Sequence, residues 1–258
     1  MPQTKIVFFD IDGTLIDMQA KKITPKMLET LHRLQDRGIK ICIATGRSPM
    51  VLPKIDGVAF DAYLTFNGSV CFDRKGVIFS NPIPHKDVVR FIQNAAALGR
   101  PVCVSTRDRL AANGTDTDLT DYFFIANEPV PVADDFDAVC AEDIYQLMLG
   151  CRPKDYPALL DGAPGAKIAA WWDRAVDVIP AGGGKGIGIE KMLAYYGLDK
   201  AEALAFGDGN NDREMLQAVG TGVAMENGSP ELKAIADEIC GPVYEDGIYH
   251  YCADKGLI

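Results

Sequence analysis

Two carboxylates one residue apart, Asp10 and Asp12, follow a short apolar run in the segment Phe8-Phe9-Asp10-Ile11-Asp12-Gly13-Thr14. The strand expected over residues 6–9 carries no charge, which is typical of a strand buried on both faces. Ligands bind at the carboxyl ends of such strands in open parallel sheets. Mg²⁺ takes one or two carboxylates there and keeps positions for phosphate oxygens. The plainer interpretation is a polar turn, because Asp and Gly are ordinary turn formers.

Three later segments favour the metal interpretation. Each follows an apolar strand or opens a helix, and they are Thr45-Gly46-Arg47, Lys185 after the glycines 182–184, and Gly207-Asp208-Gly209-Asn210-Asn211-Asp212. The carboxyl ends of neighbouring parallel strands share one edge of a sheet, so these side chains can converge with Asp10 and Asp12. The assembled set is four carboxylates, a hydroxyl, an amide and an ammonium.

This set predicts phosphoryl transfer assisted by Mg²⁺. Four carboxylates would repel one another without a divalent cation, and a ligand set of oxygens alone suits Mg²⁺. Lys185 and Thr45 would bind the oxygens of the phosphoryl group. Asp10 leaves its strand first and is the better placed nucleophile, forming an aspartyl-phosphate. Asp12 would act as general acid and later as general base.

The remaining acidic residues divide between the metal and its surroundings. Asp208 would hold the metal. Asp212 would either bind it through water or orient Lys185 by an ion pair. We also expect Gly46 and Asn211 to contribute to phosphate binding.

The elements that must position these residues alternate along both ends of the chain. Strands are expected at 5–9, 39–44, 62–66, 203–206 and 222–224, with helices from about 24 to 37, at 48–54, at 185–196 and from 230, and a polar tail. Asn67-Gly68 indicates a hairpin turn, followed by a hairpin of 69–72 with 77–80. Alternation of this kind predicts a doubly wound parallel sheet.

The middle of the chain has a different character. Helices are expected at 85–98, 117–125 and 155–160, and strands at 101–105, 144–149, 167–172 and 175–179. We therefore expect an α/β core domain made of residues 1–82 and 181–258, with a separate α+β domain of residues 83–180 inserted between its halves.

Composition excludes several classes of protein. The 258 residues are 48% apolar and 24% charged, the range of an ordinary globular chain. No apolar run is long enough to span a membrane, and the absence of a leader predicts a cytoplasmic protein. A formal charge of −10 argues against binding to nucleic acid or to anionic membranes. The seven scattered cysteines lack C-x-x-C spacing and are expected to be small core residues.

The residues and their order resemble the haloacid dehalogenase superfamily, and specifically its Cof-type sugar-phosphate phosphatase branch. The matching pieces are Asp10-x-Asp12-Gly13-Thr14, Ala44-Thr45-Gly46-Arg47, Lys185, and the segment from Gly207 to Asp212, and the resemblance extends over essentially the whole chain.

The resemblance implies the same roles for the same residues. Asp10 is implied to be the nucleophile and Asp12 the acid/base, while Mg²⁺ is bound by Asp10, the backbone carbonyl of Asp12, and Asp208. Thr45 and Lys185 are implied to grip the phosphate. The middle domain resembles the large cap of that branch, which closes over the site and reads the leaving group. The chain departs from many relatives at Gly184, where a small hydroxyl or acidic residue is common.

Other residues carry weaker expectations. Arg47 and Asn67 are candidate substrate contacts, alongside plainer roles as a solvated group and a turn residue. Trp171 and Trp172 are expected to pack within the cap, and Arg152, Asp173 and Arg174 to be solvated surface groups. None of the three histidines neighbours a motif, so a histidine nucleophile is not expected.

The predicted function is Mg²⁺-dependent hydrolysis of a small phosphomonoester, with a sugar phosphate favoured. Two alternatives stay open. One is a phosphomutase of the same superfamily. The other is a phospho-Asp signalling receiver, although the chain is long for one and Asp12 would shorten the life of a phospho-Asp. No oligomeric state is predicted.

Overall fold

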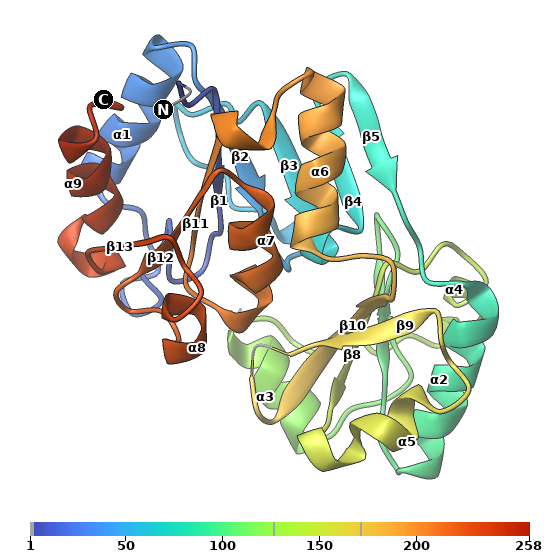
Figure 1. Ribbon diagram of the computed structural model, residues 1–258. Coiled ribbons are helices and arrows are strands. Elements are labelled where there is room, and N and C mark those ends of the chain that lie inside the picture. The colour runs from blue at the N-terminus through green and yellow to red at the C-terminus, as the bar shows by residue number, and fades with distance from the viewer. Residues whose placement is uncertain (1–2, 126, 171) are drawn as a thin grey trace. The chain divides into compact units, whose positions relative to one another are not determined.

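The computed structural model describes residues 3–125, 127–170 and 172–258, and the chain divides into two compact units (Figure 1). The first unit comprises Met1–Gly46, Pro53–Ser80 and Gly184–Ile258. The second comprises Arg47–Leu52 and Asn81–Gly183. Each unit has its own sheet.

The sheet of the first unit has the strand order β13-β12-β11-β1-β2-β3-β4-β5 among the described residues. The strands from β13 to β3 are parallel, and β4 and β5 form an antiparallel extension. Their bounds are β1 (Ile6–Phe9), β2 (Lys40–Ala44), β3 (Ala62–Thr65), β4 (Val70–Asp73), β5 (Gly76–Ser80), β11 (Ala203–Gly207), β12 (Thr221–Met225) and β13 (Glu238–Cys240). The predicted doubly wound core and the hairpin after Asn67-Gly68 are confirmed.

Helices cover both faces of this sheet, which is why its central strands have no polar face. β1 is fully buried along its length. Apolar residues of α6 (Lys185–Tyr196), α7 (Arg213–Ala218) and α8 (Pro230–Lys233) pack with one face in a common core. On the other side of the sheet lie α1 (Pro25–Asp36) and α9 (Gly247–Asp254) (Figure 1). Burial on both faces fixes the strands whose ends carry the candidate site.

The limits of α1 follow from its sequence. The Thr24 hydroxyl accepts a hydrogen bond from the Met27 N–H at 3.1 Å, and proline occupies the first turn. Gly38 follows the helix with φ of 73°, a conformation that glycine adopts without a steric penalty.

The prediction of a polar tail was wrong, because the C-terminal segment forms α9. Ile248, Tyr251 and Cys252 are buried at helical spacing. The Tyr251 ring meets Phe206 edge-on, with centroids 5.3 Å apart. A short apolar stripe inside a polar segment thus anchors the end of the chain.

The second unit is an α+β sandwich. Its antiparallel sheet has the order β7-β6-β8-β10-β9 in the part of the chain that is described. The strands are β6 (Cys103–Ser105), β7 (Leu110–Ala112), β8 (Gln146–Gly150), β9 (Ala166–Ala169) and β10 (Ala175–Pro180). The helices α2 (His85–Ala97), α4 (Phe136–Val139) and α5 (Tyr156–Leu160) share a core on one face. The other face packs against α3 (Thr117–Ile125).

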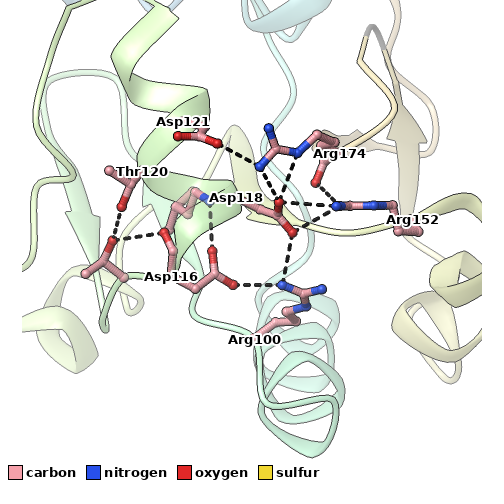
Figure 2. A network of polar contacts seen from close by, with 9 residues as sticks. Arg100, Asp116, Asp118, Thr120, Asp121, Arg152 and Arg174 are labelled. Carbon is pink, nitrogen blue, oxygen red and sulfur yellow. Dashed lines mark hydrogen bonds and ion pairs between the residues drawn. The ribbon is translucent and has the colours of Figure 1, made fainter.

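A network of ion pairs holds the start of α3, and Asp118 lies at its centre (Figure 2). The Asp118 side chain is 11% exposed and accepts hydrogen bonds from Arg152 at 3.0 Å, from Arg174 at 2.9 Å and from Arg100 at 3.2 Å. The hydrogen bond from Arg152, followed by that from Arg174, lowers the pKa of Asp118. Arg152 and Arg174 keep 35% and 36% of their side chains exposed, as surface groups would, but the structure adds ion pairs with Asp118 that were not predicted.

Several smaller predictions also change. Residues 48–54 contain only a 3-10 turn at Pro49–Val51 instead of a helix. β7, α4 and β13 were not predicted, and each has four residues or fewer. Trp171 lies outside the described residues. All seven cysteines are buried free thiols in the described chain, as expected. None of the helices in the described part of the chain has the length and apolar character that a membrane crossing requires.

Candidate active site

Two adjacent strands, β1 and β11, bring the predicted acidic residues to one edge of the first sheet. β1 lies between β11 and β2, with Phe9 opposite Phe206 on one side and Ile43 on the other. Asp10 therefore leaves the sheet beside the segment that begins at Gly207. The convergence expected from strand ends alone is present within a single unit.

Lys185, the first residue of α6, inserts its side chain between two of the carboxylates. Its ammonium group donates to Asp10 Oδ1 at 2.7 Å and to Asp212 Oδ1 at 2.5 Å. The Lys185 side chain has no exposed surface. A buried ammonium needs such partners, because desolvation of an unpaired charge is costly. The interaction with Asp10 and Asp212 outweighs desolvation and raises the pKa of Lys185, so the side chain stays charged.

The loop after β11 folds around the carboxylate of Asp212. Asp212 Oδ2 accepts hydrogen bonds from the N–H groups of Asp208 at 3.0 Å and Gly209 at 2.9 Å. A Cβ atom at Gly207 would lie 2.6 Å from Asp212 Cγ, so that glycine provides the room for this fold. Both Asp212 oxygens are used by the protein itself. This observation favours an orienting role for Asp212 toward Lys185 over direct metal binding.

Asp208 lies against the loop that follows β1, and one of its carboxylate oxygens is within 4.8 Å of an oxygen of Asp10. Asp208 Oδ1 accepts a hydrogen bond from the Thr14 hydroxyl at 3.3 Å. Desolvation, followed by the negative charge of Asp212, raises the pKa of Asp208 to about 7. Desolvation also raises the pKa of Asp10 well above its ordinary value, although the Lys185 charge opposes that change. The carboxylates of Asp10 and Asp208 are therefore poorly solvated and lie close to other negative charges.

A divalent cation fits this arrangement. Asp10, Asp208 and Asp212 each offer a carboxylate oxygen, and these oxygens lie within 4.8 Å of one another. When all three carboxylates are ionised, they and the Lys185 ammonium carry a formal charge of −2, which a divalent cation would balance. Hard oxygen donors with excess negative charge suit Mg²⁺, and a bound cation would keep these carboxylates ionised. Asp10 and Asp208 are the better ligands, since Asp212 is committed to the protein.

The other predicted residues lie at different points around this cluster. Asp12 is half-buried and is not one of those three carboxylates. Thr45 directly follows β2 and is 2% exposed, and its N–H donates to the Leu64 carbonyl at 2.8 Å. Asn211 donates from its amide to Asn67 Oδ1 at 3.1 Å. These four residues belong to the first unit.

Arg47 falls in the second unit, next to Thr45 and Gly46, which are in the first. Its guanidinium donates to the Val51 carbonyl at 3.1 Å. Its expected contact with substrate stays a prediction.

Sequence reasoning missed Asn227, which supports the loop that carries Asp12 and Gly13. The Asn227 amide donates to the Gly13 carbonyl at 2.8 Å, and its Oδ1 accepts from the Val243 N–H at 2.9 Å. The only sequence signal was the Asn-Gly pair after β12, which indicates a turn and nothing about its partners.

Comparison with known proteins agrees with this geometry. The family described as haloacid dehalogenase-like hydrolase matches residues 7–252. YkrA of Bacillus subtilis is 35% identical over 257 residues, covering 99% of both chains. The 5-amino-6-(5-phospho-D-ribitylamino)uracil phosphatase YitU of the same species is 28% identical over 262 residues, covering 95% of each.

The fold is also similar to that of a solved sugar phosphatase, BT4131. That structure has a TM-score of 0.90 and 29% sequence identity, and the match covers 99% of this chain and 100% of the other. The predicted fold class is confirmed, and the relatives named as phosphatases agree with the predicted enzyme class, a phosphoric monoester hydrolase.

Proposed function

Because this chain belongs to the family of haloacid dehalogenase-like hydrolases, we propose that it is a Mg²⁺-dependent phosphatase acting on small phosphorylated metabolites. Sugar phosphates are the favoured substrates. This choice is supported by the similarity over essentially the whole chain to a sugar phosphatase. YitU, which is named for a phosphorylated ribityl compound, is similar over nearly the same length.

The observation that carries the proposal is the contact of Lys185 with both Asp10 and Asp212, beside Asp208. One oxygen of Asp10 is held by the ammonium at 2.7 Å. That contact orients the carboxylate and leaves Oδ2 for attack on phosphorus. The positive charge of Lys185 also suits the oxygens of a phosphoryl group, and phosphoryl transfer depends mainly on positioning and charge stabilisation.

The reaction would run in two steps. Asp10 Oδ2 forms a bond to phosphorus while the bond to the leaving oxygen breaks, and Asp12 gives that oxygen its proton. Water then attacks the aspartyl-phosphate and passes a proton to Asp12, which releases inorganic phosphate and restores Asp10. Bound Mg²⁺ would supply charge neutralisation at the phosphoryl oxygens, with Asp10, Asp208 and the Asp12 carbonyl to hold it.

The roles of the remaining predicted residues belong to the same proposal. Thr45, Gly46 and Asn211 would contact the phosphate. Residues 83–180 would form the cap that selects the leaving group, with residues 1–82 and 181–258 as the catalytic core. A cytoplasmic location and a lack of affinity for nucleic acid and membranes remain predictions from composition.

The proposal is tested by phosphate release from a panel of phosphorylated metabolites, with Mg²⁺ present or removed by a chelator. We expect release from at least one sugar phosphate only with Mg²⁺, and its loss in Asp10→Asn. Asp56→Asn, at an exposed position of the same unit, is the matched control and should behave like wild type. Equal release by Asp10→Asn, or no release from any substrate, would contradict the proposal.

The same preparation separates the two alternatives. A receiver would keep its phosphate on Asp10 for minutes after treatment with acetyl phosphate. A phosphomutase would move phosphate between two positions of one sugar faster than it releases inorganic phosphate.

A further inference from the structure

The connection between β3 and β4 has an unusual backbone. Phe66, Asn67 and Gly68 follow one another with φ values of 50°, 50° and 91°. Left-handed conformations cost free energy for residues other than glycine and persist only where the surrounding structure enforces them. Phe66 and Asn67 are 1% and 2% exposed. This turn is therefore a buried, strained element, unlike an ordinary surface hairpin.

Gly68 lies directly against the residues that begin α6. A Cβ atom at Gly68 would lie 2.2 Å from the carbonyl oxygen of Gly184 and 3.2 Å from Lys185 Cα. The same Gly184 carbonyl accepts the N–H of Gly188, the first hydrogen bond of the helix, at 3.1 Å. The turn thus contacts the backbone from which the Lys185 side chain extends.

Glycines at the start of α6 also make room for the turn. A Cβ at Gly188 would lie 2.6 Å from Leu64 Cδ1 and 3.1 Å from Gly68 Cα. Gly184 has φ of 136°, which also favours glycine. Glycines on both sides of this contact allow an approach that side chains would prevent.

Asn67 joins the turn to two other parts of the candidate site. Its N–H donates to the Thr45 carbonyl at 3.0 Å, and its Oδ1 accepts from the Asn211 amide at 3.1 Å. A Cβ at Gly46 would lie 3.1 Å from Asn67 Nδ2, so the Asn67 amide fills the space beside that glycine. Asn67 therefore contacts both the segment that follows β2 and the loop that follows β11.

We infer that the turn Phe66–Gly68 is a positioning element of the site, in which Gly68 sets the placement of Lys185 and Asn67 sets that of Thr45 and Asn211. The inference rests on the proposed function only for its effect on catalysis. Its structural content, the placement of Lys185 relative to Asp10, can be measured without any substrate.

The structural test is a crystal structure of Gly68→Ala. The added methyl group would lie 2.2 Å from the Gly184 carbonyl oxygen, so the turn and the start of α6 must separate by about 1 Å to reach van der Waals distance. We expect the contact between Lys185 Nζ and Asp10 Oδ1 to lengthen beyond hydrogen-bonding distance. Gly38→Ala is the matched control, because Gly38 has φ of 73° in the same unit and no atom within 4 Å of the added Cβ. A Gly68→Ala structure that keeps the 2.7 Å contact would overturn the inference.

The kinetic test uses p-nitrophenyl phosphate with saturating Mg²⁺. We expect Gly68→Ala to lower kcat on the order of 100-fold, because a small misplacement of a catalytic group has effects of that size. In a Lys185→Met background the same substitution should change kcat less than about 3-fold, since its target is already gone. Gly38→Ala should retain wild-type kcat. If the double variant loses kcat by the product of the two single-variant losses, the inference is contradicted. An inactive wild type would instead count against the proposed function alone.

Asn67→Gly provides a second variant that does not depend on a steric clash. Glycine relieves the strain of the left-handed backbone, which offsets part of the cost of deleting a buried side chain, so we expect only a modest fall in the melting temperature. We nevertheless expect kcat to fall about 10-fold in Asn67→Gly, because Asn211 loses its hydrogen-bond partner. Asn67→Asp retains an acceptor oxygen for Asn211 and should recover most of that loss. A role limited to stability would lower the melting temperature and leave kcat unchanged.

Discussion

The backbone of Gly13 lies against the carboxylate of Asp208. A Cβ atom at Gly13 would lie 2.2 Å from Asp208 Oδ2, and the φ of 83° at Gly13 is unfavourable for any other residue. The Thr14 hydroxyl donates to the other oxygen of the same carboxylate. The turn that follows Asp10 and Asp12 is therefore shaped to receive Asp208, and two motifs at opposite ends of the chain form one structure.

Gly13→Ala should damage metal binding more than folding. The methyl group would displace the Asp208 carboxylate, so we expect the Mg²⁺ concentration for half-maximal activity to rise at least 10-fold. Titration of activity with Mg²⁺ measures this change. Gly38→Ala carries a similar backbone penalty without a clash and should leave the titration unaltered. Identical titrations of Gly13→Ala and wild type would show that Asp208 tolerates the displacement.

Mg²⁺ should stabilise the folded chain through the acidic cluster. A ligand that binds only the native state stabilises it by about 2.7 kcal/mol at 100 times its Kd. We expect the melting temperature to rise by several degrees when Mg²⁺ replaces a chelator. Asp208→Asn should lose most of that shift and Asp56→Asn none of it. A shift of equal size in Asp208→Asn would place the stabilising ion elsewhere.

Lys185→Arg should inactivate the enzyme although it conserves charge. The Lys185 side chain has no exposed surface and meets two carboxylate oxygens at 2.7 Å and 2.5 Å. A guanidinium group is larger and planar, and overpacking costs about 1–3 kcal/mol. We expect kcat to fall more than about 100-fold and thermal stability to drop. Lys191→Arg, at an exposed position of the same helix, should retain both properties. Activity within threefold of wild type would argue against a fitted ammonium site.

The sequence allowed the acidic cluster to be predicted because a single rule of topology covers it. Asp10, Lys185 and Asp208 each follow an apolar strand or begin a helix, and parallel strands bring such positions to one edge. The residues through which these segments pack against one another could not be predicted in the same way. The closeness of Gly68 to Gly184 depends on atomic packing, and nothing in Asn67-Gly68 distinguishes it from a surface turn.

The ion pairs of the second unit were missed for a related reason. Asp118 meets Arg100, Arg152 and Arg174, which come from separate connections in an antiparallel sheet. No short motif links residues spaced so widely. A charged residue considered alone is expected at the surface, and only the packing of α3 reveals that Asp118 is buried.

Asp118→Asn should destabilise the protein far more than Asp135→Asn. Removing a buried charge that pairs with several arginines costs about 3–5 kcal/mol, because the arginines lose the negative charge and one of the two carboxylate oxygens. Asp135 forms a comparable pair with Arg109 but has a side chain that is 53% exposed, so its loss should be close to neutral. Thermal and urea unfolding of both variants checks the difference. Equal destabilisation would mean that burial does not determine the strength of these pairs.

The contribution of Asp118 should depend on pH in a defined direction. Hydrogen bonds from Arg152 and Arg174 lower the pKa of Asp118 in the folded state. Its stabilising effect is then complete above the ordinary aspartate pKa of about 4 and is lost as the pH falls through the lowered folded value. The stability gap between wild type and Asp118→Asn should be constant from pH 8 to about pH 5 and shrink below about pH 4. A gap that widens under acid would reverse this sign.

The most direct measurement is to locate the phosphate on the protein during turnover. Enzyme mixed with Mg²⁺ and an active phosphorylated substrate is quenched in acid within milliseconds, digested and mapped by mass spectrometry. The account predicts an acid-stable phosphate on the peptide that contains Asp10, absent in Asp10→Asn. Phosphate release without any labelled peptide, or a label on a residue other than Asp10, would contradict it.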